Sequence, residues 1–222
     1  MRWIELALYA SALAVVGLVV GAILWSGEAP YRDLAVANGV RSYEFVLQPP
    51  LERQVMDLNG AVVLHEQWSR YVTGGSAEPP RPEPSLFTDD EYSHMADVRG
   101  VFDVAKFAIP VALFVIIVRL QRARLRGARA MWQLVRDGSA TAAVAVAVLG
   151  VLAVVAFEPL FLAFHQVFFP QGNFLFDPRT SNLIRLYPQW YWEGISLRVG
   201  LSFIALALAM AAVAQLRLRA AK

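Results

Sequence analysis

Four long apolar stretches dominate this sequence, and they constrain its fold more than any other feature. The first runs from Ile4 to Trp25 with only Glu5 and Ser11 as polar interruptions. A helix rises about 1.5 Å per residue and a bilayer core is about 30 Å thick, so roughly 20 apolar residues can cross a membrane. Hydrophobic residues make up 57% of the 222 residues and charged residues only 17%, which is too apolar for an ordinary water-soluble domain. The sequence therefore predicts an integral membrane protein.

The first apolar stretch has a second interpretation, a signal peptide, because Arg2 precedes it. It is longer than the usual apolar core of a signal peptide, about 7–15 residues, and no small-residue cleavage site clearly follows it. We therefore expect a retained membrane span at residues 1–25.

Charged residues between the apolar stretches predict which side of the membrane each connection occupies. The short segment between the second and third stretches carries six arginines: Arg119, Arg122, Arg124, Arg126, Arg129 and Arg136. Short loops rich in lysine and arginine mark the cytoplasmic side, and between two spans this explains the arginines better than nucleic-acid binding does. We therefore expect a cytoplasmic loop here, both termini on the same side, and no nucleic-acid partner.

The predicted fold class is all-α integral membrane, a four-transmembrane-helix bundle with a small extracytoplasmic domain that has room for a short strand or two. We expect its parts in the following order: transmembrane helix 1 (residues 1–25), the extracytoplasmic domain (26–100), transmembrane helix 2 (101–118), a basic cytoplasmic loop (119–138), transmembrane helix 3 (139–164), an outer loop (165–193), transmembrane helix 4 (194–216) and a cytoplasmic tail (217–222). Every histidine then falls on the outer side.

The outer domain, residues 26–100, is polar, with 12 acidic residues against 6 basic ones. Residues 42–47 alternate between polar and apolar as a short half-buried strand does. Between Leu51 and Tyr71 apolar residues recur at three- and four-residue spacing, which predicts an amphipathic helix. Residues 73–85 hold two glycines and four prolines and are typical of a linker without helix or sheet.

Thr88-Asp-Asp-Glu91 has the spacing of a capping box. In this motif the threonine hydroxyl accepts a hydrogen bond from the glutamate amide while the glutamate side chain reaches back to the threonine amide. A helix should begin here and continue without a break into the second apolar stretch. Its first turns are polar and would extend beyond the membrane.

Two of the three histidines lie beside the predicted outer ends of spans. His165 follows a long apolar run among phenylalanines, where an unpaired polar group would cost about 2 kcal/mol or more. His94 lies about two turns before the apolar part of span two, so side-by-side packing of the two spans would form a shared site. The alternative is that each imidazole only hydrogen-bonds water, lipid headgroups or loop carbonyls. His65, with only Glu66 beside it, is expected to be a solvated helix residue.

Nearby charged residues are candidates for supporting roles. Asp97 follows His94 by three residues and so shares its helical face, where a carboxylate can hold an imidazole in one tautomer. Arg185 could bind a phosphate or an oxyanion, or pair with an acid such as Asp177. The sequence has no cysteine, no His-Glu-x-x-His pattern, no P-loop and no dinucleotide fingerprint, so we expect no metal and no cofactor.

Three groups of residues form a distinctive set: Phe87-Thr-Asp-Asp-Glu91-Tyr-Ser-His94-Met-Ala-Asp97-Val98; Phe164-His165-Gln-Val-Phe168-Phe169; and Phe176-Asp177-Pro178 with Leu183-Ile184 and Tyr187-Pro188. Together they resemble the bacterial lipoprotein intramolecular transacylases, four-span membrane acyltransferases. The likeness covers nearly the whole chain, and the pair of histidine motifs is its specific part. Tyr187 stands where the family is expected to have a phenylalanine, and the proline-rich linker is longer than is typical.

The resemblance implies an enzyme of the cytoplasmic (inner) membrane with its active site on the extracytoplasmic face. Its substrate would be a diacylated lipoprotein, and it would move the sn-2 acyl chain of the diacylglyceryl group to the α-amino group of the N-terminal cysteine, giving a lyso-form lipoprotein. His94 and His165 would be the acid/base pair, with membrane lipids as further partners and no cofactor. The expected supporting residues are Asp97, Glu91, Asp177 and Arg185. Which histidine is the base, whether an acyl-histidine forms, and the oligomeric state stay open.

Two other functions fit the same residues. A membrane lipid or lipoprotein hydrolase would use the same histidines with water as the acceptor, and it would release free fatty acid. A non-catalytic lipid-binding membrane subunit would use the outer domain as a docking surface, and its histidines would be replaceable.

Overall fold

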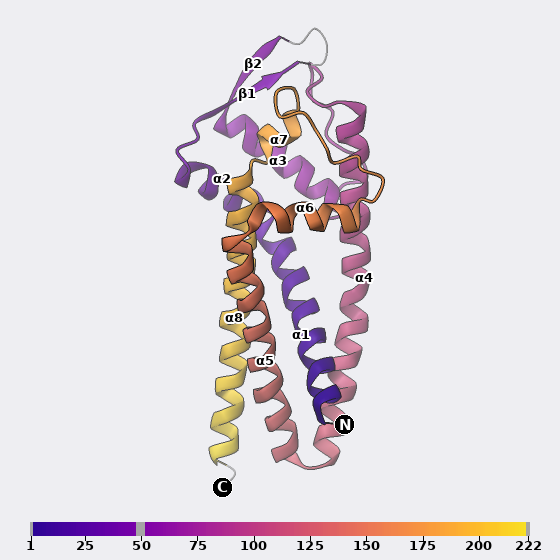
Figure 1. Cartoon of the computed structure of the whole chain (residues 1–222), viewed down its shortest axis with the longest axis vertical. Coiled ribbons are helices and arrows are strands. Elements are labelled where there is room, and N and C mark those ends of the chain that lie inside the picture. Colours follow the sequence, from indigo (N-terminus) through magenta and orange to yellow (C-terminus); the bar gives the residue numbers. More distant parts are fainter. Residues whose placement is uncertain (1, 48–51, 221–222) are drawn as a thin grey trace. The chain divides into compact units, whose positions relative to one another are not determined.

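The computed structural model describes residues 2–47 and 52–220, which form helices and one small sheet (Figure 1). In chain order the elements are α1 (Arg2–Trp25), α2 (Glu28–Ala37), β1 (Ser42–Val46), β2 (Arg53–Asp57), α3 (Leu58–Val72), α4 (Asp89–Leu125), α5 (Ala128–Val155), α6 (Phe157–Phe168), α7 (Asn182–Leu186) and α8 (Gln189–Ala220). Four of these helices, α1, α4, α5 and α8, are long and apolar enough to cross a membrane. The predicted fold class is therefore confirmed.

The chain divides into two compact units. Unit 1 comprises Met1–Ala22, Ala105–Val155 and Ser196–Lys222, and it holds most of the long apolar helices. Unit 2 comprises Ile23–Val104 and Ala156–Ile195, and it holds the sheet and the shorter helices.

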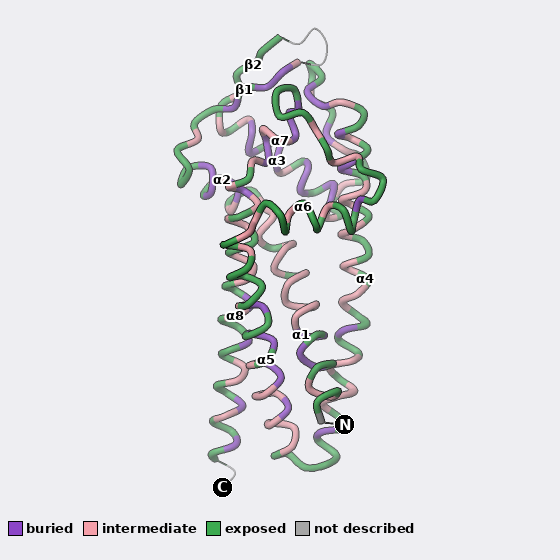
Figure 2. The backbone as a smooth tube through the Cα atoms, in the orientation of Figure 1, coloured by how far each residue is buried: buried purple, intermediate pink, exposed green. Residues whose placement is uncertain are grey.

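Unit 1 is packed through small residues and leaves its apolar outer faces exposed, as a membrane bundle does (Figure 2). Gly138 lets α5 approach Tyr9 of α1, because a Cβ at this position would lie 2.3 Å from the Tyr9 ring. Glu5, the acidic interruption of the first apolar stretch, accepts a hydrogen bond from Arg126 at 2.7 Å. The charge of that carboxylate is thus balanced within the unit.

Unit 2 has a buried hydrophobic core, like that of a globular domain, which includes Trp68, Tyr31 and Phe45. β1 and β2 form an antiparallel pair in which Tyr43 lies opposite Met56, so the predicted strand at residues 42–47 is confirmed. The helix predicted from Leu51 to Tyr71 is wrong in its first part, because residues 53–57 are β2 and α3 begins at Leu58. The pairing with β1 satisfies the backbone of these residues, and the side chain of Asp57 then caps α3 by accepting from the Gly60 amide at 2.8 Å.

The start of α4 is as the capping box predicts. The Glu91 amide donates to the Thr88 hydroxyl at 3.2 Å, and the Thr88 amide donates to the Glu91 carboxylate at 2.9 Å. α4 then runs for 37 residues, about 55 Å at the helical rise, which is longer than a bilayer core of about 30 Å. The proline-rich linker before it contains neither helix nor strand, also as predicted.

The segment predicted as one third span, residues 139–164, is two helices. α5 ends at Val155, Ala156 leaves the helical conformation with φ −139° and ψ 49°, and α6 begins at Phe157. Pro159 accounts for the break, because it has no amide hydrogen to donate to the carbonyl of Val155 and its ring crowds that carbonyl. His165 therefore lies in a separate 12-residue helix and not at the end of the spanning helix.

Candidate active site

Three segments of unit 2 bring the candidate site together. The first polar turns of α4 carry His94 and Asp97, and α6 carries His165. The loop that follows α6 then returns with Gln171 and Asn173. The imidazole rings of His94 and His165 lie 5.9 Å apart between centroids and are within 21° of parallel. The two histidines that the sequence predicts as a pair are thus neighbours.

Phenylalanine rings surround both imidazoles. Phe169 contacts both, with its ring centroid 4.7 Å from that of His94 and 5.3 Å from that of His165. Phe176 contacts His94 at 5.6 Å, while Phe161 contacts His165 at 4.3 Å. His94 is only 6% exposed, and His165 is half-buried. The site is therefore apolar and mostly closed to water around His94.

This environment lowers the pKa of both histidines. Burial is the main cause of the fall of the His94 pKa to about 4, the neighbouring His165 adds to it, and a hydrogen bond with Asn173 and the charge of Asp97 oppose it. Burial also lowers the pKa of His165, against a hydrogen bond with the Phe161 carbonyl. His94 lies in the charged first turns of α4, before the apolar part of that helix. Both imidazoles are consequently neutral at pH 7.

The tautomer of His165 follows from its hydrogen bond. Its Nδ1 lies 2.8 Å from the carbonyl oxygen of Phe161, one turn earlier on α6. A carbonyl can only accept, so Nδ1 carries the proton and Nε2 presents a lone pair. The Nδ1 atom of His94 is buried without a hydrogen-bond partner among the described residues.

Asp97 reaches His94 through an intermediary. Its carboxylate accepts from the Gln171 side chain at 2.7 Å and from the Asn173 side chain at 2.5 Å, and Asn173 in turn hydrogen-bonds His94. Gly172, between the two amides, has φ +79°, the left-handed conformation that this tight turn requires. Sequence reasoning missed both amides; the only available signal was the Gln-Gly-Asn turn six residues after His165.

The other predicted supporting residues lie around the segment that leads to α7. Glu91 is 1% exposed and accepts from the Ser181 hydroxyl at 2.6 Å and from the Leu183 amide at 2.8 Å. Asp177 forms an ion pair with Arg179 at 2.7 Å. Arg185 donates to the backbone carbonyls of Glu44 and Arg179. These bonds fasten the chain between residues 177 and 186.

His65 is not the solvated helix residue that the sequence suggests. It is 1% exposed and stacks on Tyr31 with ring centroids 4.1 Å apart. Its Nε2 lies 3.0 Å from the Ser26 carbonyl and its Nδ1 lies 3.2 Å from the Tyr187 hydroxyl. The prediction failed because burial of His65 depends on partners 34 or more residues away in the chain. Among the described residues, no group of three or more histidines and acids is placed to hold a metal ion.

Comparison with known proteins bears on this geometry. The model of the family described as lipoprotein intramolecular transacylase Lit matches residues 58–192. This segment includes His94, His165, Asp97 and the loop that carries Gln171 and Asn173.

The chain belongs to this family.

Membership in the Lit family makes the chain an acyltransferase, an enzyme that moves an acyl group within a lipoprotein. The solved structure of the membrane-integral Lit of Bacillus cereus is similar, with a TM-score of 0.69 and 11% identity, over 97% of this chain and 94% of that chain. A variant of that protein with one histidine replaced by arginine matches with a TM-score of 0.63 and 11% identity, over 100% and 95%. At this identity the structures support the common fold alone. No curated protein sequence matches the chain.

Proposed function

We propose that this Lit-family enzyme moves the sn-2 acyl chain of a diacylated lipoprotein to the α-amino group of the lipoprotein's own N-terminal cysteine. The observation that supports this most directly is the pair of neutral imidazoles, 5.9 Å apart between ring centroids, enclosed by phenylalanines. The reaction forms one amide bond and breaks one ester bond. One proton leaves the nitrogen and one proton reaches the glycerol oxygen, so two groups that exchange protons are sufficient.

We assign the base to His165 and the acid to His94. The Nε2 lone pair of His165 takes the proton from the attacking amine, because its Nδ1 proton is held by the Phe161 carbonyl. The amine nitrogen bonds to the ester carbonyl carbon and forms a tetrahedral intermediate. The proton then passes from the His165 imidazolium to the neighbouring His94, and the His94 imidazolium gives it to the departing glycerol oxygen as the intermediate collapses, which leaves both imidazoles neutral.

The surroundings of the histidines support acyl transfer within one molecule. Donor ester and acceptor amine belong to the same substrate, and holding such groups in reacting geometry can be worth about 7–11 kcal/mol. The aromatic enclosure disfavours water, which is the competing acceptor. Asp97 supports His94 through Asn173, while Glu91, Asp177 and Arg185 support the site by fixing the chain between residues 177 and 186.

We further propose that the enzyme lies in the cytoplasmic (inner) membrane with its active site on the extracytoplasmic face. The arginine-rich connection between α4 and α5 supports this orientation. A reporter enzyme inserted after Gly127 should be active in the cytoplasm; periplasmic or external activity would contradict the orientation without touching the proposed chemistry.

The chemistry is tested by feeding a diacylated lipopeptide to vesicles that contain the purified full chain. Transacylation leaves the total mass of the lipopeptide unchanged, and fragmentation in a mass spectrometer locates one acyl chain on the N-terminal amine. Acid/base groups contribute about 10²- to 10⁴-fold, so His94→Ala and His165→Ala should each slow the reaction by about that factor. Release of free fatty acid by the parent enzyme would indicate a hydrolase instead.

Each histidine variant has a matched control on the same helix. Ser93→Ala changes the exposed neighbour of His94, and Gln166→Ala changes the exposed neighbour of His165. Both controls should react at the parent rate. If the two histidine variants also transfer acyl chains at the parent rate, the catalytic assignment is wrong and a non-catalytic role for these residues is favoured.

A further inference from the structure

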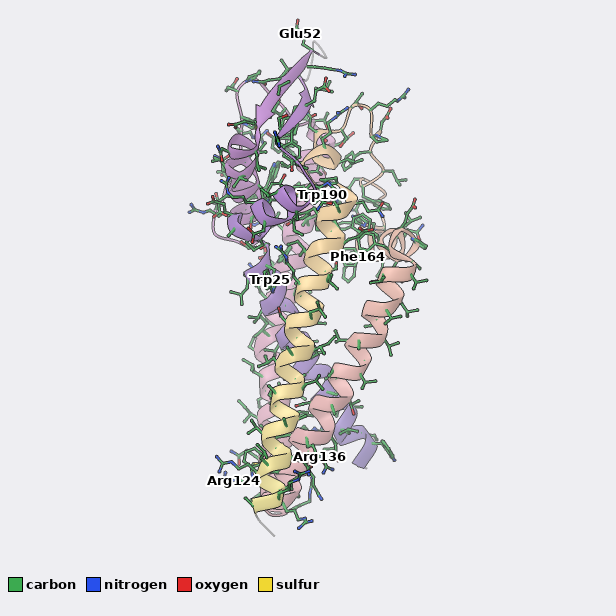
Figure 3. The ribbon with its side chains drawn as sticks, turned by 90° about the vertical axis from the view of Figure 1, so that its left-hand side faces the viewer. Trp25, Glu52, Arg124, Arg136, Phe164 and Trp190 are labelled. Carbon is green, nitrogen blue, oxygen red and sulfur yellow. The ribbon has the colours of Figure 1, made fainter. Side chains whose placement is uncertain are left out.

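Six side chains line a cavity of about 360 Å³ in unit 1, three from each of α5 and α8: Arg129, Gln133, Arg136, Gln215, Leu218 and Arg219. On α5 the three residues are spaced by four and three, and on α8 Leu218 and Arg219 lie three and four residues after Gln215, so each set shares one helical face. Farther along α5, the side chains that pack against other helices are apolar, as at Ala142 and Val146. If the polar residues around the cavity served only to pack α5 against α8, we would expect them to be apolar too. Figure 3 shows Arg136 at the same end of unit 1 as Arg124, in the last turn of α4.

The cavity has an excess of positive charge. Arg136 already has partners, because its Nε donates to Asp137, outside the lining, at 2.7 Å, and its Nη1 donates to Gln215, within the lining, at 3.1 Å. Arg129 and Arg219 are exposed, and within residues 2–47 and 52–220 neither guanidinium has an ion-pair partner. The lining residues include no carboxylate. Two guanidinium groups therefore face this cavity without a counter-charge from its walls.

We propose that this cavity binds the phosphate group of an anionic phospholipid. Guanidinium groups are planar forks that bind phosphate oxygens through paired hydrogen bonds, and the two glutamine side chains add amide groups for the headgroup hydroxyls. The cavity volume, about 360 Å³, lies within the range of pockets that bind small molecules, about 300–1,000 Å³. Basic pockets between spanning helices are known lipid-headgroup sites in membrane proteins.

The position of the cavity favours a lipid over a soluble phosphate. It lies where the apolar parts of α5 and α8 end, and a lipid phosphate stands at that depth in a bilayer. Leu218 gives the lining an apolar member, and Val213 and Leu216, a few residues earlier on α8, are exposed apolar side chains against which acyl chains can lie. The proposed acyl-transfer substrate carries a diacylglyceryl thioether and no phosphate, so this ligand is a different molecule.

The proposal is tested by native mass spectrometry of the full chain in detergent, titrated with one lipid at a time. Phosphatidylglycerol should bind at a saturable site about tenfold or more tightly than phosphatidylcholine with the same acyl chains. Equal binding of the two lipids would overturn the proposal. Inorganic phosphate and glycerol phosphate are added as competitors; displacement of the lipid at sub-millimolar concentration would assign the site to soluble phosphate and overturn the lipid assignment.

Matched variants distinguish lipid binding in the cavity from general attraction of anionic lipids to the basic end of unit 1. Arg129→Gln with Arg219→Gln removes two cavity charges, whereas Arg122→Gln with Arg124→Gln removes two exposed charges outside the lining. At about 1 kcal/mol for each basic residue, the cavity pair should weaken phosphatidylglycerol binding by about thirtyfold, and the control pair by about threefold or less. Equal losses in the two pairs would refute a specific site.

A second variant covers the case in which the cavity pair does not fold. Arg129→Lys with Arg219→Lys keeps both charges and loses the planar forks, so binding should fall to an intermediate level. Unchanged binding in a folded lysine pair would show that charge alone attracts the lipid, and would contradict recognition by these side chains. The melting temperature of each variant in lipid-free detergent reports whether it is folded.

Discussion

Replacing Asn173 by alanine should slow acyl transfer, because this amide joins the Asp97 carboxylate to His94. The substitution removes one hydrogen bond from the imidazole, and one neutral hydrogen bond in a protein is worth about 0.5–1.5 kcal/mol. If that bond holds the ring in reacting geometry, kcat should fall about two- to tenfold. KM should change less, because the imidazole moves protons and the acyl chains are held elsewhere.

Gln171→Ala is the matched control for this substitution. Gln171 donates to the same Asp97 oxygen at 2.7 Å and lies in the same turn, but its described hydrogen bonds go to Asp97 and Asn173 and not to His94. Loss of loop anchoring affects both variants, whereas loss of the bond to the imidazole affects only Asn173→Ala. The full chain in vesicles, supplied with a diacylated lipopeptide and assayed by mass spectrometry, should give Gln171→Ala a kcat within about twofold of the parent.

The pKa of His94 gives a second readout that loop damage would not move in this direction. The hydrogen bond with Asn173 raises that pKa against the effect of burial, so its loss should lower the value further. With only three histidines in the chain, ¹³C-labelled histidine gives three assignable ring signals, and His65 and His165 serve as internal references. Equal kcat losses in the two variants, or a His94 pKa that does not fall in Asn173→Ala, would refute the hydrogen-bonded link from Asp97 through Asn173 to His94.

Three further changes test the packing around the site and in unit 1. His65 has its pKa lowered to about 4 by burial, so the unfolded chain takes up a proton first as the pH falls below about 6.5. Stability should therefore drop between about pH 6.5 and pH 4, on the order of 3 kcal/mol from this residue, and His65→Phe should flatten that part of a melting-temperature profile. Glu91 accepts hydrogen bonds from the Thr88 amide, the Ser181 hydroxyl and the Leu183 amide, and in Glu91→Gln the NH₂ group that replaces one oxygen cannot accept from them. This substitution should lower the free energy of unfolding by about 3 kcal/mol, seen as a lower melting temperature than in the parent. Gly138→Ala places a methyl group against Tyr9 and should cost about 1–3 kcal/mol, whereas Gly150→Ala meets open space and should leave the melting temperature unchanged or slightly higher.

The parts of the structure that sequence predicts well are those governed by local rules. The capping box at Thr88 and Glu91 and the long apolar runs are contained within a few turns of the chain, and both are found as expected. The break before α6 was within reach of the same reasoning, since Pro159 cannot donate to Val155. Hydrophobicity alone hides this break, because the apolar run continues through it.

The parts that sequence does not predict depend on contacts between distant segments. Asn173 binds a carboxylate 76 residues earlier in the chain, and its Gln-Gly-Asn turn alone does not distinguish it from an ordinary loop asparagine. Glu91 satisfies its own helix end through the predicted box, yet its second oxygen holds the Leu183 amide 92 residues later. Residues 53–57 have apolar spacing that suits a helix, but β1 offers them a hydrogen-bonded partner. Each outcome is decided by tertiary pairing rather than by propensity.

A lowered histidine pKa is at first sight a poor property for a base, since the α-amino group of the substrate has a pKa of about 7.7–8.0. The amine, however, enters an apolar site, where burial favours its neutral form. Its proton has to leave only after the nitrogen bonds to the ester carbon, when the nitrogen has become positively charged and strongly acidic. A weak base can take that proton, and the imidazolium that results is a strong acid because its pKa is low. The burial that weakens the histidines as bases thus strengthens them in the second half of the reaction, where a glycerol alkoxide must be protonated as it leaves.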